Sequence, residues 1–387
     1  MDNEFSIVFT GDIGFDKYMN EKWNDDDLLS EDVRSFIEEC DHLVVNVEGP
    51  LLSDSTSESF EGAAALKHSM SPQVADFLNR IGADVWNIDN NHIMDAGAEG
   101  LERTLDAAQK CKAKTLGAGM NLEEAAKPVV FDVNGGIGLV AVGYERACRK
   151  ATKDTPGCLN WSNMETVEAA IANVKKSCRW CIVVAHDGEE FTALPSPYVR
   201  DRYHRYLEMG ADIVVAHHPH VPMNYETVDK KIIFYSLGNF IFDTDYQRSQ
   251  QNTDRGILLK LCFNEEGYEF EPLGIRIDRD TEHIVKDSLP DIFEDIKEDE
   301  YEILKPLAAA MLLENTKRQC RYLYPDKYNN ASDEDWYNEF HMDMRSGCVP
   351  GQLLDFKLIY ELAMQAESKE WEKSKLEKVK QFMLEQM

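Results

Sequence analysis

Positive charge is scarce in this sequence. Against 71 Asp and Glu residues it has only 41 Lys and Arg, which gives a formal net charge of −30 at pH 7. A surface of this sign repels nucleic acid and anionic membranes, because binding to phosphates needs clustered cations. We therefore expect no nucleic-acid partner. An acidic substrate would need local positive charge, and a bound metal ion is one source of it.

Long apolar segments are also missing. No stretch approaches the roughly eighteen apolar residues of a transmembrane helix. The first residues, MDNEFSIVFTGD, include no basic segment, and the apolar run at 5–9 is too short for a signal peptide. Nine cysteines, an odd number scattered along a long chain, are typical of reduced thiols. These features predict a cytoplasmic protein without a membrane anchor.

Apolar runs and helical patterns alternate through most of the chain. Strands are predicted at 6–10, 42–49, 84–89, 138–144, 180–186, 212–218 and 231–239, and helices at 28–40, 71–82 and 97–111. The strand segments are nearly continuous in apolar residues, as expected for strands that are buried on both faces. The alternation predicts an α/β fold of layered sheets flanked by helices, with largely parallel strands.

The character of the sequence changes near residue 284. From Asp291 onward the chain is acidic, with apolar positions at helical spacing. This pattern predicts a core domain of residues 1–283 and a helical C-terminal region of residues 284–387. Neither His283 nor His341 lies in a cluster of possible ligands. We therefore expect the appended region to be dispensable for metal binding.

Polar residues fall at the ends of the predicted strands. In open α/β sheets, ligands bind beyond the carboxyl ends of the strands. Six such ends carry Asp, Glu, Asn or His, at 11–12 (GD), 46–49 (NVEG), 89–92 (DNNH), 185–190 (AHDGEE), 216–220 (AHHPH) and 236–240 (SLGNF). A helix cap or a turn explains any one of them alone. The six together are much harder to explain without a common site.

The AHHPH segment indicates a metal. Pro219 stiffens its backbone, and residues two apart in an extended chain point the same way, so His218 and His220 can face one ion. Mixed carboxylate, amide and imidazole ligands suit Mn, Fe or Zn better than Ca or Mg. One or two divalent ions are expected. Two ions could share a bridging carboxylate and activate a water for attack on phosphorus or a carbonyl carbon.

The motifs GD, NxEGPL, NNHxxDxG, HxGxE, HHPH and YSLGNFxFD occur in this order over roughly residues 5–280. They resemble the CapA family of bacterial capsule synthesis proteins, which are associated with poly-γ-glutamate and resemble calcineurin-like metallophosphoesterases in fold. The resemblance implies a metallophosphoesterase-like site with Glu48 as the bridging carboxylate. The other implied ligands are Asn91, His186 and His218 for one ion, and Asp12 and His220 for the other. His217 could replace His218, because the sequence does not fix the register within HHPH.

The resemblance also bears on groups that would act on a substrate. His92 would lie beside the reacting group, where it would stabilise charge or protonate a leaving group. Lys67 matches a lysine that is common in the family. Glu190 could orient His186 or act as a base. In one place the chain departs from metallophosphoesterases, whose first motif is DxH, because Gly14 follows Asp12 at that spacing.

Two functions follow from these observations. The first is a metal-dependent hydrolase that acts on a phosphoester or amide bond of a small-molecule or polymer substrate, phosphorylated or γ-glutamyl in kind. The alternative is a non-catalytic accessory or binding protein in surface-polymer metabolism. The set of imidazoles favours the enzyme, and the missing DxH histidine favours the accessory protein.

Overall fold

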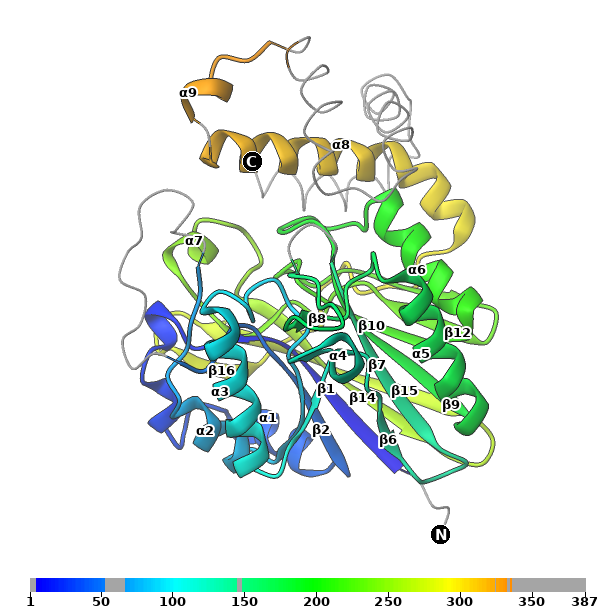
Figure 1. The fold of residues 1–387 in the computed structure, drawn as a ribbon. Coiled ribbons are helices and arrows are strands. Elements are labelled where there is room, and N and C mark those ends of the chain that lie inside the picture. Colours follow the sequence, from blue (N-terminus) through cyan, green and yellow to red (C-terminus); the bar gives the residue numbers. More distant parts are fainter. Residues whose placement is uncertain (1–4, 53–66, 145–147, 324, 333–334, 336–387) are drawn as a thin grey trace.

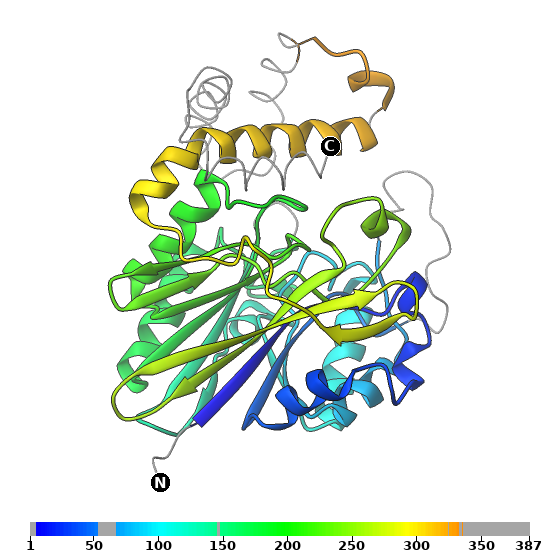
Figure 2. The same cartoon turned by 180° about the vertical axis from the view of Figure 1, so that it is seen from behind.

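The protein is described by a computed structural model that covers residues 5–52, 67–144, 148–323, 325–332 and 335. The end of the predicted C-terminal region, including His341, lies outside these residues. Two β-sheets pack face to face and helices cover their outer faces (Figures 1 and 2). The layered α/β fold with flanking helices that the sequence predicts is therefore confirmed.

The first sheet has eight strands in the order β16-β15-β14-β1-β2-β3-β4, with β13 paired to the end of β1. Strands β1, β2, β3, β4 and β13 are parallel to one another, and β14, β15 and β16 extend the sheet in antiparallel fashion. Their bounds are β1 Phe5–Gly14, β2 His42–Val47, β3 Ala83–Asn87, β4 Lys114–Leu116, β13 Asn239–Phe242, β14 Arg255–Phe263, β15 Tyr268–Asp278 and β16 His283–Lys286.

The second sheet has six strands in the order β11-β12-β10-β9-β7-β6. Its four central strands are parallel, and β11 and β6 are antiparallel edges. Their bounds are β6 Val129–Phe131, β7 Ile137–Gly143, β9 Trp180–His186, β10 Ile213–His217, β11 Tyr225–Val228 and β12 Lys231–Phe234. A short pair, β5 Ala118–Gly119 and β8 Gly157–Cys158, stands apart from both sheets.

Helices pack on the two outer faces. Apolar side chains of α1, α2 and α3 cover the first sheet, and those of α5 and α6 cover the second. Helix bounds are α1 Glu31–Glu38, α2 Val74–Arg80, α3 Gly97–Lys110, α4 Leu122–Ala125, α5 Met164–Ser177, α6 Pro197–Met209, α7 Asp245–Arg248, α8 Glu298–Leu323 and α9 Pro325–Tyr328, with 3-10 turns η1 Lys17–Met19 and η2 Lys22–Asn24.

The strands are buried on both faces, as their composition predicts. Ile7 and Phe9 of β1 point into the core between the sheets, whereas Val8 packs under the helices. Complete burial on both sides removes the polar positions that would mark an exposed face. The continuous apolar run is thus the consequence of a four-layer arrangement.

The sheet continues to Lys286 in β16, and α8 then crosses the end of the molecule where the parallel strands finish (Figures 1 and 2). The residue at which the core domain ends stays a prediction. Among the described residues, no helix combines the length and the apolar character needed to cross a membrane.

A buried ion network ties α6 and β11 to the start of α8. Arg200 donates to Glu226 from Nε at 3.0 Å and from Nη2 at 2.6 Å, and also pairs with Glu298 of α8. His204 Nε2 lies 3.1 Å from Glu226, and Tyr235 Oη donates to it at 2.6 Å. Burial raises the pKa of Glu226, but the hydrogen bonds from His204 and Arg200 outweigh it and bring that pKa to about 2.

We expect Glu226→Gln to destabilise the fold by about 3–5 kcal/mol at neutral pH, because it leaves the buried Arg200 without its buried carboxylate partner and with only the exposed Glu298 to pair with. The folded-state pKa lies below the unfolded value, so the stabilisation is present above about pH 4.5 and is lost as pH falls towards 2. Urea unfolding at pH 7 and at pH 3 measures both effects. Glu302→Gln, which removes an exposed pair with Lys305, is the control. Equal stability of wild type and Glu226→Gln at pH 7 would contradict the assignment.

Candidate metal centre

The polar residues that follow the parallel strands come together at one end of the two sheets. β1 carries Asp12, and Glu48 follows β2 directly. The loop after β3 carries Asn91, β9 ends on His186, and the segment after β10 carries His218 and His220. Because β1 joins the first sheet and β9 and β10 the second, the site lies between the sheets at their carboxyl edges.

Two groups of buried side chains could each hold a metal ion. Glu48, His186 and His218 form the first group, and Asp12, Glu48 and His220 form the second, with the ligand atoms of each group within 4.8 Å of one another. None of these five residues is more than 5% exposed. Glu48 belongs to both groups and is therefore placed to bridge two ions.

In the first group, Asn91 adds an oxygen beside the imidazoles. His186 Nε2 lies 2.8 Å from Asn91 Oδ1 and 3.8 Å from Glu48 Oε1. The ring centroids of His186 and His218 are 5.0 Å apart. Burial, and then the neighbouring imidazole of His218, hold the pKa of His186 well below its usual value. This histidine is accordingly neutral, which is the form that binds a metal.

In the second group, the orientation of His220 is fixed by an amide. Asn239 Nδ2 donates to Gln247 Oε1 at 3.1 Å and to the Thr253 carbonyl at 2.8 Å. Its Oδ1 therefore faces His220 Nδ1, at 2.9 Å. His220 Nε2 is turned to Glu48 Oε1, at 3.6 Å. A hydrogen bond at one ring nitrogen that sets the other nitrogen towards the ion is the usual arrangement of histidine ligands.

Asp12 is held in place and ionised. Asn46 Nδ2 donates to its Oδ1 at 2.8 Å, and the backbone N–H of His218 points at its Oδ2 from 3.4 Å. Burial raises the pKa of Asp12, but the hydrogen bond and positive charge of His220 outweigh it, so the pKa is lowered. Asp12 can therefore offer a carboxylate to the second group. Burial lowers the pKa of His220, but Glu48 and Asp12 outweigh it and raise that pKa to about 10, so a metal ion at this group would displace the proton on Nε2.

Glu48 tests whether these residues fit a metal ion. Both of its carboxylate oxygens are buried, and among the described residues neither has a hydrogen-bond partner. Burial raises the pKa of Glu48 to about 8, against the attraction of His220. A buried carboxylate without donors is costly unless a positive charge compensates it. A divalent cation bound between the two groups would provide that charge, so the residues fit.

The HHPH segment is not extended, contrary to the expectation from its sequence. His218 has φ 99° and His220 has φ 58°, both in the left-handed region that non-glycine residues rarely adopt. The two rings consequently enter different groups instead of facing one ion. The structure brings His218 into the first group and leaves His217 outside it, with His217 Nε2 at 2.8 Å from the Thr10 carbonyl oxygen.

The three residues expected to act on a substrate differ in position. His92 lies beside the groups but in neither of them, and its Nδ1 is 2.7 Å from Asp95 Oδ2. Burial lowers the pKa of His92, but the bond to Asp95 outweighs burial and raises that pKa. Glu190 is partly buried, and its charge acts on Glu48 and on His220. Lys67 is exposed.

His68 is a residue that sequence reasoning missed. It is 5% exposed, its Nδ1 lies 3.2 Å from Asp16 Oδ2, and its backbone N–H donates to Asp95. A Cβ on Gly49 would come within 2.5 Å of the His68 ring, and one on Gly14 within 3.1 Å of Nε2. The imidazole thus occupies space beside Gly14, the position at which DxH proteins carry a histidine. No periodicity or motif around His68 predicts this placement.

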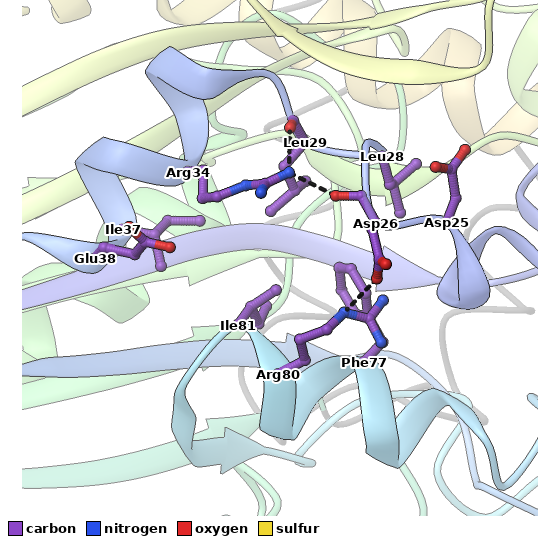
Figure 3. A pocket seen from close by; sticks show the side chains of 10 residues that line it. All are labelled: Asp25, Asp26, Leu28, Leu29, Arg34, Ile37, Glu38, Phe77, Arg80 and Ile81. Atoms are coloured by element: carbon purple, nitrogen blue, oxygen red, sulfur yellow. Dashed lines mark hydrogen bonds and ion pairs between the residues drawn. The ribbon is translucent and has the colours of Figure 1, made fainter.

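A cavity of about 320 Å³ lies elsewhere, lined by α1, α2 and the turn at 25–29 (Figure 3). Its two arginines are already engaged. Arg34 donates to the carbonyl oxygens of Asp26 and Leu29, and Arg80 donates to that of Trp23. None of the candidate ligands lines this cavity, so it is separate from the metal centre.

The chain belongs to a family described as bacterial capsule synthesis protein PGA_cap, whose model matches residues 6–244. It is 28% identical over 257 residues to the capsule biosynthesis protein CapA of Bacillus anthracis, covering 64% of this chain and 62% of that one. It is 29% identical over 256 residues to the PGA biosynthesis protein CapA of Bacillus subtilis strain 168, covering 65% and 67%. The chain thus spans less than two thirds of the Bacillus anthracis protein.

More remote likenesses exist. A probable polyglutamine synthesis accessory protein of Mycobacterium tuberculosis is 25% identical over 218 residues, covering 52% of this chain and 56% of that one. Among solved structures, a purple acid phosphatase from yellow lupin seeds has 13% identity and a TM-score of 0.34, covering 76% of this chain and 55% of that one. At that TM-score the likeness supports neither a shared fold nor a shared activity.

Proposed function

We propose that this protein is a metal-dependent hydrolase of capsule or poly-γ-glutamate metabolism, which cleaves a phosphoester or amide bond in an anionic substrate. The observation that carries the proposal is Glu48, a buried carboxylate with no hydrogen-bond donor among the described residues, which belongs to both groups of candidate ligands. The names of the chain's relatives connect the family with capsule and PGA biosynthesis. The cytoplasmic location stays a prediction.

The chemistry would divide between the ion and the side chains. A divalent ion supplies positive charge that polarises the scissile group and makes water a better nucleophile. Glu48, Asp12 and the imidazoles would hold and orient that ion. The positive charge also allows an anionic substrate to approach a chain with a net charge of −30.

His92 would deliver the proton. Its Nδ1 is held by Asp95, which fixes the ring and leaves Nε2 for the substrate. The raised pKa keeps a proton on the imidazole near neutral pH, as a general acid for a leaving alkoxide or amine requires.

We expect His218→Ala to lose most of the metal of the first group, and His217→Ala to keep it. His218 belongs to the ligand set, whereas His217 bonds a backbone carbonyl outside it. Elemental analysis of the purified variants, with circular dichroism to verify folding, makes the comparison. Metal retained by His218→Ala and lost from His217→Ala would reverse the register assigned here.

A non-catalytic accessory role is the second candidate. Gly14 stands where DxH proteins carry a histidine, and the Mycobacterium tuberculosis relative is named an accessory protein. Assays of the metal-loaded protein on phosphomonoester, phosphodiester and γ-glutamyl substrates decide between the two. Turnover of one class supports the hydrolase, and inactivity on all of them favours the accessory protein.

A further inference from the structure

The C-terminal helix α8 packs on the loop that leaves the metal centre. After His186 the chain runs through 187–196 before α6 begins. Ala193 and Leu194 in this loop pack against Leu304, Leu307, Ala308 and Met311 of α8. Tyr301 of α8 also donates from Oη to the Pro195 carbonyl at 3.0 Å. The loop is therefore enclosed between the metal centre and a helix that lies beyond the family match at 6–244.

Arg318 brings α8 to the edge of the site. Its Nη1 donates to Gln250 Oε1 at 2.9 Å, and its Nη2 donates to the Glu190 carbonyl at 3.3 Å. Its guanidinium carbon lies 5.1 Å from the centre of the Phe191 ring. The guanidinium thus donates from two nitrogens while it lies over an aromatic ring, and the single ammonium of a lysine cannot reproduce this combination.

Phe191 connects this guanidinium to a metal-binding side chain. Its ring stacks on the imidazole of His220, with centroids 5.8 Å apart and planes 24° apart. Phe191 has φ 61°, and its N–H donates to the Pro219 carbonyl at 2.8 Å. A phenylalanine in this left-handed region is strained and persists only where its surroundings hold it. Arg318, His220 and Tyr246, which all contact the ring, are such surroundings.

We propose that Arg318 is a positioning residue of the metal centre, which holds His220 for the second ion through Phe191. The inference rests on the proposed metal-dependent function. It replaces the expectation that the C-terminal region is dispensable for metal binding, because the contacts of Arg318 with Phe191 and of Phe191 with His220 join α8 to the second group. The first group, which has no such contact with α8 among the described residues, should depend on Arg318 much less.

The test is metal binding by the full-length Arg318→Ala variant. Titration of the metal-free protein with Mn²⁺ in a calorimeter should show two binding steps for the wild type. We expect the variant to weaken Mn²⁺ affinity roughly tenfold in one binding step, which is the low end of the effect of residues that orient ligands. The affinity in the other step should change less than threefold. The Mn²⁺ affinity of Arg318→Lys in the affected step should lie between those of the wild type and Arg318→Ala. Lys305→Ala, on the same helix and paired only with Glu302 in the described contacts, is the matched control.

A double-mutant cycle with Phe191→Leu separates positioning from a general loss of packing. If Arg318 acts through the ring, removing Arg318 in the Phe191→Leu background should have little further effect on the affected step. Additive losses, or two unchanged steps in Arg318→Ala, would overturn the inference. A wild-type protein that binds no Mn²⁺, Zn²⁺ or Fe²⁺ would instead reject the proposed function itself.

Discussion

His92→Ala should retain its metal and lose about 100- to 10,000-fold in turnover, the range that a positioned general acid contributes. His92 lies outside both groups of ligand atoms, so its removal leaves those groups complete. The variant loses only the protonated imidazole. Burial lowers the pKa of that imidazole, but Asp95 outweighs burial, raises the pKa and orients the ring. Steady-state kinetics of the metal-loaded variant, on whichever substrate class the wild type turns over, measure the loss.

Asp95→Asn is the companion variant. It keeps the shape of the partner but removes the charge that favours imidazolium, so it should lower the apparent pKa of the alkaline limb of the pH–rate profile, which reports the general acid. Arg103→Ala, which removes an exposed ion pair with Glu99 on α3, serves as a control for unspecific effects. Loss of metal from His92→Ala would make His92 a ligand and contradict its assignment as the acid.

Glu48→Gln should abolish stoichiometric metal binding at both groups, whereas His218→Ala affects mainly the first. Glu48 is the residue that the two groups share, and an amide cannot bridge two cations as a carboxylate does. Residues that only orient metal ligands change metal affinity by up to about 100-fold. Because Glu48 is itself a ligand, its replacement should weaken metal affinity by more than that. Elemental analysis and calorimetric titration measure it.

Stability distinguishes this loss of ligand from unfolding. The metal-free wild type buries a carboxyl group without hydrogen-bond donors, and glutamine replaces it with a neutral side chain of similar shape. Metal-free Glu48→Gln should therefore unfold at no lower urea concentration than the metal-free wild type. A variant that folds normally and still binds two ions would refute the bridging role.

Much of the fold follows from local pattern. The apolar runs around Ile7 and Val183 predict buried strands because helices and a second sheet cover both sides of each strand. Strand β15 is not found by continuous apolar runs, because it is half exposed and its apolar residues alternate with charged ones, as in YEFEPLGIRID. The division into two sheets also escapes local pattern, because pairing partners far apart in sequence decide it.

The candidate site divides in the same way. Asp12, Glu48 and His186 each end or follow a strand, so the rule that ligands gather at carboxyl edges predicts them. His68 and Arg318 come from segments without such a signal, and only tertiary packing brings them to the site. The left-handed backbone at His218 is likewise invisible in sequence, because non-glycine residues adopt it only under tertiary constraint.

Anomalous diffraction from crystals of the full-length protein grown with Mn²⁺ or Zn²⁺ tests the central claim most directly. The account predicts two anomalous peaks on either side of the Glu48 carboxylate, one beside His186 and His218 and the other beside Asp12 and His220. Ions that share a bridge lie about 3.5–4 Å apart. An anomalous map with no peak within bonding distance of Glu48, from crystals whose metal content is confirmed by fluorescence, would contradict it.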